Sequence, residues 1–273
     1  MDEQLLVEEI YRKSSFLCLG LDTDLTKIPK HLLVNPDPVF AFNKLMIDSL
    51  CNLVVAVKIN TAFYEVNGAD GWVSLEKTIE YLNSNYPKIF TIADAKRGDI
   101  GNTSDKYAKA FFENLGFDSV TVSPYMGKDS IEPFLNYKEK KTILLALTSN
   151  IGSEDFQFLN TNDFKLYEQV IIKSKTWEGF ENLMFVVGAT KSEYIKSIRE
   201  LVPKSFLLVP GVGAQGGNIS EVFKNAANDH IGILINSSRA ILYAGSGKDF
   251  LEKSILIAKS YQREMSELIN LKT

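Results

Sequence analysis

The sequence predicts a single-domain α/β protein with a (β/α)₈ fold, the architecture known as a TIM barrel. Eight short runs of apolar and β-branched residues recur along the 273 residues, on average about 31 residues apart, which is the length of one strand–helix unit. Stretches with helical periodicity alternate with these runs, and one more follows the last run. Periodicity does not show whether a sheet closes, so a doubly wound open sheet is the alternative.

The eight runs are hydrophobic along nearly their whole length, as expected for parallel strands that are buried on both faces. None of the uninterrupted apolar stretches exceeds five residues, far fewer than a membrane-spanning helix requires. The predicted strands cover residues 16–21, 53–57, 89–93, 119–122, 142–147, 183–187, 206–209 and 231–235.

The stretches between the runs place apolar residues on one face of a helix. The predicted helices cover residues 37–50, 72–84, 103–115, 129–137, 163–177, 191–200, 218–228 and 249–270. Residues 2–13 predict an extra N-terminal helix, and no linker or shift in composition divides the chain, so we expect one domain over residues 1–273. The segment 150–162 is longer than a simple strand–helix loop and is either a lid or an insertion.

Composition excludes several classes of protein. Thirty basic and 34 acidic residues give a net charge of −4, and no basic patch indicates nucleic acid binding. The acidic start predicts no secretory or transit segment, so we expect a cytoplasmic location. Cys18 and Cys51 lack partners at metal-binding spacing and are expected to be reduced. His31 and His230 are the only histidines, which excludes most metal-hydrolase and catalytic-triad designs.

Polar residues follow the predicted strands, where a barrel carries its chemistry. In a strand, Asp94 and Lys96 point to the same side, so both are expected to face the barrel mouth. Asp99 and Lys58 add charges nearby, and buried charges are unfavourable unless they pair with one another or with a ligand. The cluster therefore predicts a catalytic site, with a structural ion-pair network as the alternative. Other strand-end residues are Asp22, Asn60, Ser123, Thr148, Ser149, Asn150, Pro210, Asn236, Ser238 and Arg239.

The glycine-rich segment 210–217 follows the seventh predicted strand and predicts a phosphate site. Its Gly-x-Gly-x-x-Gly pattern is a weak dinucleotide signal, because it does not open a first strand–helix–strand unit. Arg239, after the eighth strand, supplies a bidentate phosphate donor. A flexible glycine turn is the alternative, but such a turn does not explain the arginine at the neighbouring strand end.

Residues 92–103 (Ile-Ala-Asp-Ala-Lys-Arg-Gly-Asp-Ile-Gly-Asn-Thr) resemble the signature of the orotidine 5′-phosphate decarboxylase family, and of its longer bacterial branch, type 2, in particular. The similarity spans residues 16–244 in order. Its further motifs are Leu19-Gly-Leu-Asp22, Lys58-x-Asn60-x-Ala-Phe-Tyr-Glu65, Val122-Ser-Pro-Tyr-Met-Gly127, Val209-Pro-Gly-Val-Gly-Ala-Gln-Gly-Gly217 and Asn236-Ser-Ser-Arg-Ala240.

The resemblance implies decarboxylation of orotidine 5′-monophosphate to UMP without a cofactor or metal, in pyrimidine nucleotide synthesis. By position, Lys58, Asp94, Lys96 and Asp99 would form a charged tetrad in which Lys96 protonates the C6 carbanion. Asp99 and Thr103 would reach the site of the neighbouring subunit, which implies a homodimer.

The same resemblance implies a substrate-binding set. Asp22 and Lys58 would contact ribose hydroxyls, and Ser123 would contact the pyrimidine. The phosphate would be held by Gln215, Gly217, Ser238 and Arg239, and the substrate site would also include Asn60 and Pro210.

Two other functions remain open from the residues alone. One is a related Mg²⁺-dependent sugar-phosphate decarboxylase or an aldolase-type enzyme, including a Schiff-base aldolase that uses Lys58 or Lys96. The other is a nucleotide-binding module without catalytic activity.

Overall fold

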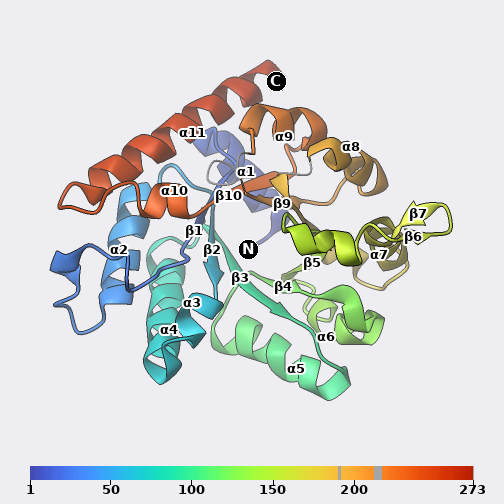
Figure 1. Ribbon diagram of the computed structural model, residues 1–273, viewed down its shortest axis with the longest axis horizontal. Helices are drawn as coiled ribbons and strands as arrows, with labels where there is room; N and C mark the ends of the chain where they lie inside the picture. Colours follow the sequence, from blue (N-terminus) through green and yellow to red (C-terminus); the bar gives the residue numbers. More distant parts are fainter. Residues whose placement is uncertain (190–191, 212–216, 273) are drawn as a thin grey trace.

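Parallel strands close into a barrel at the centre of the protein (Figure 1). This computed structural model describes residues 1–189, 192–211 and 217–272, and eight of the strands in these ranges form the barrel in the order β1-β10-β9-β8-β5-β4-β3-β2. Because β1 pairs with both β2 and β10, the predicted (β/α)₈ barrel is confirmed and the open sheet is wrong. The barrel strands are β1 (Leu17–Gly20), β2 (Ala56–Asn60), β3 (Phe90–Arg97), β4 (Ser119–Val122), β5 (Lys141–Leu147), β8 (Leu183–Val187), β9 (Leu207–Pro210) and β10 (Ile233–Ser237).

Helices surround the barrel, and their apolar faces pack against the outer side of the strands (Figure 1). The longer helices are α1 (Glu3–Lys13), α2 (Pro38–Leu50), α4 (Gly68–Asn85), α5 (Gly101–Lys109), α7 (Leu166–Ser174), α8 (Ser192–Leu201), α9 (Ile219–Ala226) and α11 (Phe250–Lys272). Shorter helical elements are α3 (Ala62–Glu65), α6 (Glu132–Leu135), α10 (Arg239–Leu242), the π turn η2 (Ala110–Asn114), and the 3₁₀ turns η1 (Lys30–Leu32), η3 (Pro124–Met126), η4 (Lys128–Ser130), η5 (Ile151–Asp155) and η6 (Phe180–Asn182).

Two predicted helices differ from the structure. The predicted helix over residues 129–137 is wrong in extent, because the chain forms η4 and then the one-turn helix α6. Pro133 lies in the first turn of α6, where its missing N–H is tolerated, whereas within a longer helix it would remove a hydrogen bond. The prediction over residues 163–177 is wrong at its start, because β6 (Asn160–Thr161) and β7 (Phe164–Lys165) form an antiparallel hairpin and α7 begins only at Leu166.

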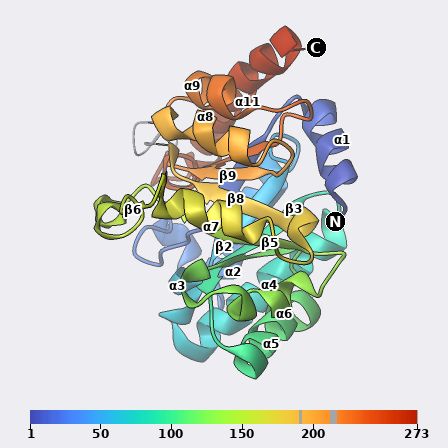
Figure 2. The same cartoon turned by 90° about the vertical axis from the view of Figure 1, so that its right-hand side faces the viewer.

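Helix α1 and the β6–β7 hairpin lie at opposite ends of the barrel (Figure 2). Glu3 of α1 pairs with Lys141, at the start of β5, at 2.7 Å, and the amino group of Met1 pairs with Asp118, just before β4. The hairpin segment follows the other end of β5, where the Gln157 side chain accepts from the Thr148 N–H at 2.8 Å. None of the helices in the described ranges has the length and apolarity needed to cross a bilayer.

Candidate active site

A cavity of about 400 Å³ opens at the carboxyl ends of the barrel strands. This volume is in the range of small-molecule binding sites. Polar side chains at the ends of β1, β2, β3, β5 and β10 line the cavity together with apolar side chains from β5, β8 and β9. The lining residues are Asp22, Lys58, Asn60, Asp94, Lys96, Leu145, Thr148, Ser149, Asn150, Val186, Leu208, Pro210, Gly211, Asn236, Ser238 and Arg239.

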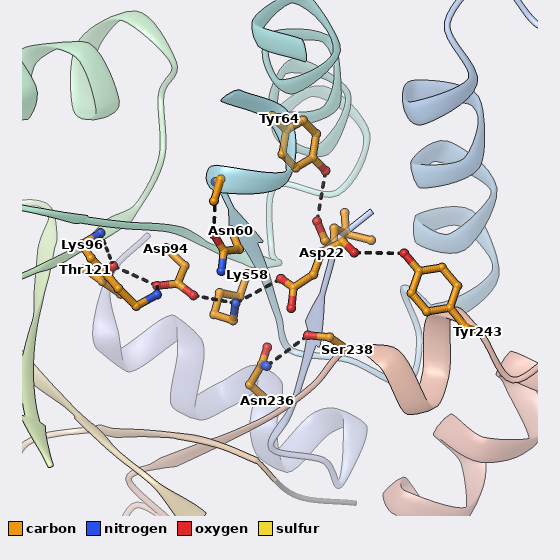
Figure 3. A network of polar contacts seen from close by, with 12 residues as sticks. Asp22, Lys58, Asn60, Tyr64, Asp94, Lys96, Thr121, Asn236, Ser238 and Tyr243 are labelled. Atoms are coloured by element: carbon orange, nitrogen blue, oxygen red, sulfur yellow. Dashed lines mark hydrogen bonds and ion pairs between the residues drawn. The ribbon is translucent and has the colours of Figure 1, made fainter. Parts of the chain in front are cut away.

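Four charged side chains alternate in sign along one side of the cavity (Figure 3). Lys58 Nζ donates to Asp94 Oδ2 at 2.8 Å and to Asp22 Oδ1 at 3.3 Å. Lys96 Nζ donates to the other oxygen of Asp94, Oδ1, at 2.6 Å. Asp94 therefore bridges two ammonium groups, and each oxygen of its carboxylate accepts from one of them.

The network keeps its buried members ionised. Burial by itself would raise the pKa of Asp94, but Lys58 and Lys96 outweigh burial and hold that pKa well below its usual range. Burial by itself would lower the pKa of Lys58, but the carboxylates of Asp94 and Asp22 raise it above its usual range. Both groups are therefore charged near neutral pH.

The two lysines differ in their access to the cavity. The Lys58 side chain is only 5% exposed, whereas that of Lys96 is 48% exposed. Lys58 is thus enclosed by its two carboxylate partners, and the ammonium of Lys96 can meet a ligand while it still contacts Asp94.

Lys96 has a left-handed backbone, with φ of 49°, at a register shift in the pairing of β3 with β4. Few residues other than glycine adopt this conformation. Asp94 and Lys96 both line the cavity, as the sequence predicted, but the regular strand geometry behind that prediction is wrong for this segment.

Two tyrosines hold the backbone around Asp22 (Figure 3). The Tyr243 hydroxyl donates to the Asp22 carbonyl at 3.0 Å and accepts from the Asp24 N–H at 2.8 Å. Tyr64, on α3, donates its hydroxyl to the carbonyl of Leu21 at 3.2 Å. Burial raises the pKa of Tyr243 to about 12, so its hydroxyl remains protonated and able to donate.

The residues predicted to bind phosphate follow β10, which neighbours β1 in the barrel, and β9 next to it. Ser238 and Arg239 line the cavity after β10, and Pro210 lines it at the end of β9. Gly217 does not line the cavity, and its N–H donates to the Gly211 carbonyl at 3.3 Å. Gln215 lies outside the described residues.

Besides Gly217, three further predicted residues lie outside this cavity. Asp99 is half-buried and accepts a hydrogen bond from the following Ile100 N–H at 2.8 Å, and Thr103 is exposed on α5. Ser123, half-buried after β4, donates its N–H to the Arg97 carbonyl at 2.8 Å. The chain thus brings Lys58, Asp94 and Lys96 together and leaves Asp99 outside its own cavity.

The predicted site omits several residues that the fold places there. Leu145, Val186 and Leu208 look like ordinary strand residues in the sequence, and only barrel closure shows that they face the cavity. Asn236, which the sequence marks only as a strand-end residue, is 7% exposed, and its Nδ2 donates to Ser238 Oγ at 3.3 Å. Its Oδ1 is buried without a hydrogen-bond partner among the described residues. A buried amide in an apolar strand is the signal that could have identified Asn236.

The two cysteines do not line this cavity. Cys18 and Cys51 are free thiols, and burial raises the pKa of Cys18 to about 12, so Cys18 remains a thiol. Among the described residues, no three histidine, cysteine, aspartate or glutamate side chains are grouped as metal ligands.

Comparisons with known proteins bear on the family to which the chain belongs. The model of the orotidine 5′-phosphate decarboxylase / HUMPS family matches residues 15–253. The chain is 63% identical over 272 residues to a Flavobacterium johnsoniae protein named orotidine 5′-phosphate decarboxylase, with 100% of each covered. It is 53% identical to a Bacteroides fragilis protein of the same name, with 98% of each covered.

A solved structure of Leishmania donovani OMP decarboxylase superposes with a TM-score of 0.80 at 33% identity, over 95% of this chain and 98% of that chain. The family model, the full-length relatives and the barrel fold all point to the same family. The chain belongs to the orotidine 5′-phosphate decarboxylase / HUMPS family.

Proposed function

We propose that this protein is a carboxy-lyase that converts orotidine 5′-monophosphate to UMP and CO₂ without a cofactor. The observation that carries the proposal is the Asp22–Lys58–Asp94–Lys96 network, which fixes an accessible ammonium group at the edge of the cavity. Membership of the family and the names of the full-length relatives support the same reaction.

In the proposed reaction, the bond between C6 and the carboxylate breaks and leaves its electron pair on C6. The ammonium of Lys96 stabilises this negative charge, and it is already in place before the bond breaks. Lys96 then donates a proton from Nζ to C6, which completes UMP. Asp94 keeps Lys96 oriented, and Lys58 keeps Asp94 ionised.

The substrate would lie across the cavity, with its phosphate toward the ends of β9 and β10. Arg239 is exposed at the cavity and makes no ion pair within the described ranges, so it has donors to offer a phosphate. Among the residues that line the cavity, we assign the phosphate to Arg239 and Ser238 and the ribose hydroxyls to Asp22 and Lys58, with Asn60 and Pro210 as further contacts. On the family resemblance alone, we add Gln215 and Gly217 for the phosphate and Ser123 for the pyrimidine.

We propose that two copies of the chain form a homodimer, in which Asp99 and Thr103 complete the neighbouring site. Apolar side chains beside Asp99 support an interface there: Ile100 is 59% exposed and Tyr125 is 87% exposed. The Ser123 N–H bond to the Arg97 carbonyl brings these two loops together. We place this enzyme in the cytoplasm, where pyrimidine nucleotides would be made.

The test is a decarboxylation assay that follows the loss of orotate absorbance when purified protein is mixed with orotidine 5′-monophosphate. We expect turnover that persists in EDTA, with UMP as the product. A folded dimer that does not turn over this substrate would contradict the proposal. Activity abolished by EDTA would favour the Mg²⁺-dependent alternative, and borohydride trapping of a carbonyl substrate would favour a Schiff-base aldolase.

A further inference from the structure

We propose that Thr121 is a positioning residue, whose hydroxyl fixes Asp94 and Lys96 relative to each other. This inference rests on the proposed decarboxylation for its effect on turnover. Thr121 lies on β4, is completely buried and does not line the cavity, so it acts through its two neighbours and not on the substrate.

The hydroxyl of Thr121 makes two hydrogen bonds of opposite direction. Its Oγ1 accepts from the backbone N–H of Lys96 at 2.9 Å and donates to Asp94 Oδ1 at 3.1 Å (Figure 3). Asp94 Oδ1 is also the oxygen that accepts from Lys96 Nζ. One hydroxyl therefore connects the backbone of the proposed proton donor to the carboxylate that orients its ammonium.

The pairing of β3 with β4 explains why this side chain is needed. Ala93 pairs with Val120 and Arg97 pairs with Val122, so three residues of β3, 94–96, lie opposite Thr121 alone. Such a bulge takes backbone groups out of the regular ladder. The N–H of Lys96 finds its acceptor in the Thr121 side chain.

The requirements at this position exclude an apolar replacement. A hydroxyl can donate one hydrogen bond while it accepts another, and both are used here. Valine has the same shape but would leave the Lys96 N–H and one site on Asp94 without their partner in a buried setting. Serine would retain both bonds. The hydrogen bond that fixes the left-handed backbone of Lys96 would therefore be lost with valine and kept with serine.

The activity test compares Thr121→Val with Thr121→Ser and with Thr142→Val. Thr142, on the neighbouring strand β5, is also completely buried, but its hydroxyl has no partner in the described part of the chain. We expect Thr121→Val to lower kcat about 10- to 100-fold while KM and the affinity for UMP change less than about 3-fold. Thr121→Ser and Thr142→Val should both stay within about 3-fold of the wild-type kcat.

Equal kcat values for wild type and Thr121→Val would overturn the proposal. A loss of kcat in Thr142→Val as large as that in Thr121→Val would also overturn it, because it would indicate a general effect of altering the core. If Thr121→Val does not fold, Thr121→Ala removes the same hydroxyl without its branched shape and replaces it in the comparison.

A second measurement does not depend on activity. Hydrogen exchange of the Lys96 amide should be at least about 10-fold faster in Thr121→Val than in wild type or Thr121→Ser, because its acceptor is gone. Unchanged exchange would overturn the positioning role whatever the enzyme does. A wild-type protein that does not decarboxylate its substrate would instead contradict the proposed function.

Discussion

The β1–β3 side and the β10 side of the cavity differ in whether their polar side chains have partners within the protein. On the β1–β3 side, every charge is bound to another: Asp22 and Asp94 both hold Lys58, and Asp94 also holds Lys96. On the β10 side, within the described residues, Arg239 has no ion pair and Asn236 Oδ1 has no hydrogen bond.

This difference separates two tasks. Charges that are already paired and oriented act on a reaction without rearranging, which is how a site stabilises a transition state. Donors and acceptors without protein partners have their bonding capacity available for a ligand. We therefore expect the β1–β3 side to carry the chemistry and the β10 side to bind the phosphate, and the predictions below test this division.

The largest effect is expected from Lys96→Ala. It removes the proposed acid, so kcat should fall by about 10⁴-fold or more, whereas UMP should bind with an affinity within about 3-fold of wild type. Stopped assays and calorimetry measure the two quantities, and Lys259→Ala, on an exposed position of α11, is the control. Near-wild-type turnover in Lys96→Ala would remove Lys96 from the chemical step.

The next test asks whether the charged side is completed by a second chain. Lys96→Ala and Asp99→Ala should each be inactive alone, but subunits reassorted from an equal mixture should recover about a quarter of wild-type activity. Half of the dimers then contain both variants, and each of these has one intact site. Heterodimers that form, as seen by native mass spectrometry, but remain inactive would place Asp99 outside its neighbour's site.

Arg239→Ala tests the binding side. The loss of the proposed phosphate donor should lower kcat/KM for orotidine 5′-monophosphate by about 10²- to 10³-fold. Activity on orotidine, which lacks the phosphate, should be the same in variant and wild type, and Arg263→Ala on the exposed face of α11 should change neither. An equal loss on both substrates would mean that Arg239 acts beyond phosphate binding.

A smaller effect is expected on stability as a function of pH. Lys58 and Lys96 overcome burial and lower the pKa of Asp94 in the folded protein. The ionised Asp94 carboxylate therefore stabilises the fold at pH values above its unfolded-state pKa of about 4, and this stabilisation is lost as the pH falls below that value. Asp94→Asn should therefore lower the free energy of unfolding by about 3 kcal/mol at pH 7, and by less in acid. Denaturant titrations across pH measure this difference.

The control for that titration is Asp70→Asn, which alters an exposed carboxylate on α4 and should change stability little at any pH. If the difference in free energy of unfolding between wild type and Asp94→Asn stays constant from pH 7 to pH 3, the ionised form of Asp94 does not stabilise the fold.

The barrel could be predicted because its strands are buried on both faces, which gives continuous apolar runs. The charged strand ends could be predicted because ionised groups such as Asp94 and Lys96 are unfavourable there without partners. The β6–β7 hairpin could not be predicted, because Phe164 fits a helical pattern in the sequence. In the structure Phe164 lies on β7 and is 41% exposed.

The bulge in β3 could not be predicted from the sequence either. Thr121 is a β-branched residue in an apolar run and looks like any other strand residue, so nothing local indicates that it lies opposite three residues. The shift depends on the pairing of two strands that are far apart in sequence, and single-sequence periodicity does not contain that information.

The left-handed backbone of Lys96 carries a conformational cost that the ion-pair network offsets. A side chain in this conformation is destabilising by about 1 kcal/mol relative to glycine, but glycine would leave Asp94 Oδ1 without the Lys96 ammonium. Glycine at position 96 would therefore relieve backbone strain and weaken the pairing of a buried carboxylate at the same time. Position 96 thus couples backbone strain, the stability of the network and the proposed reaction, and heat-resistant variants of this enzyme should be sought at positions away from it.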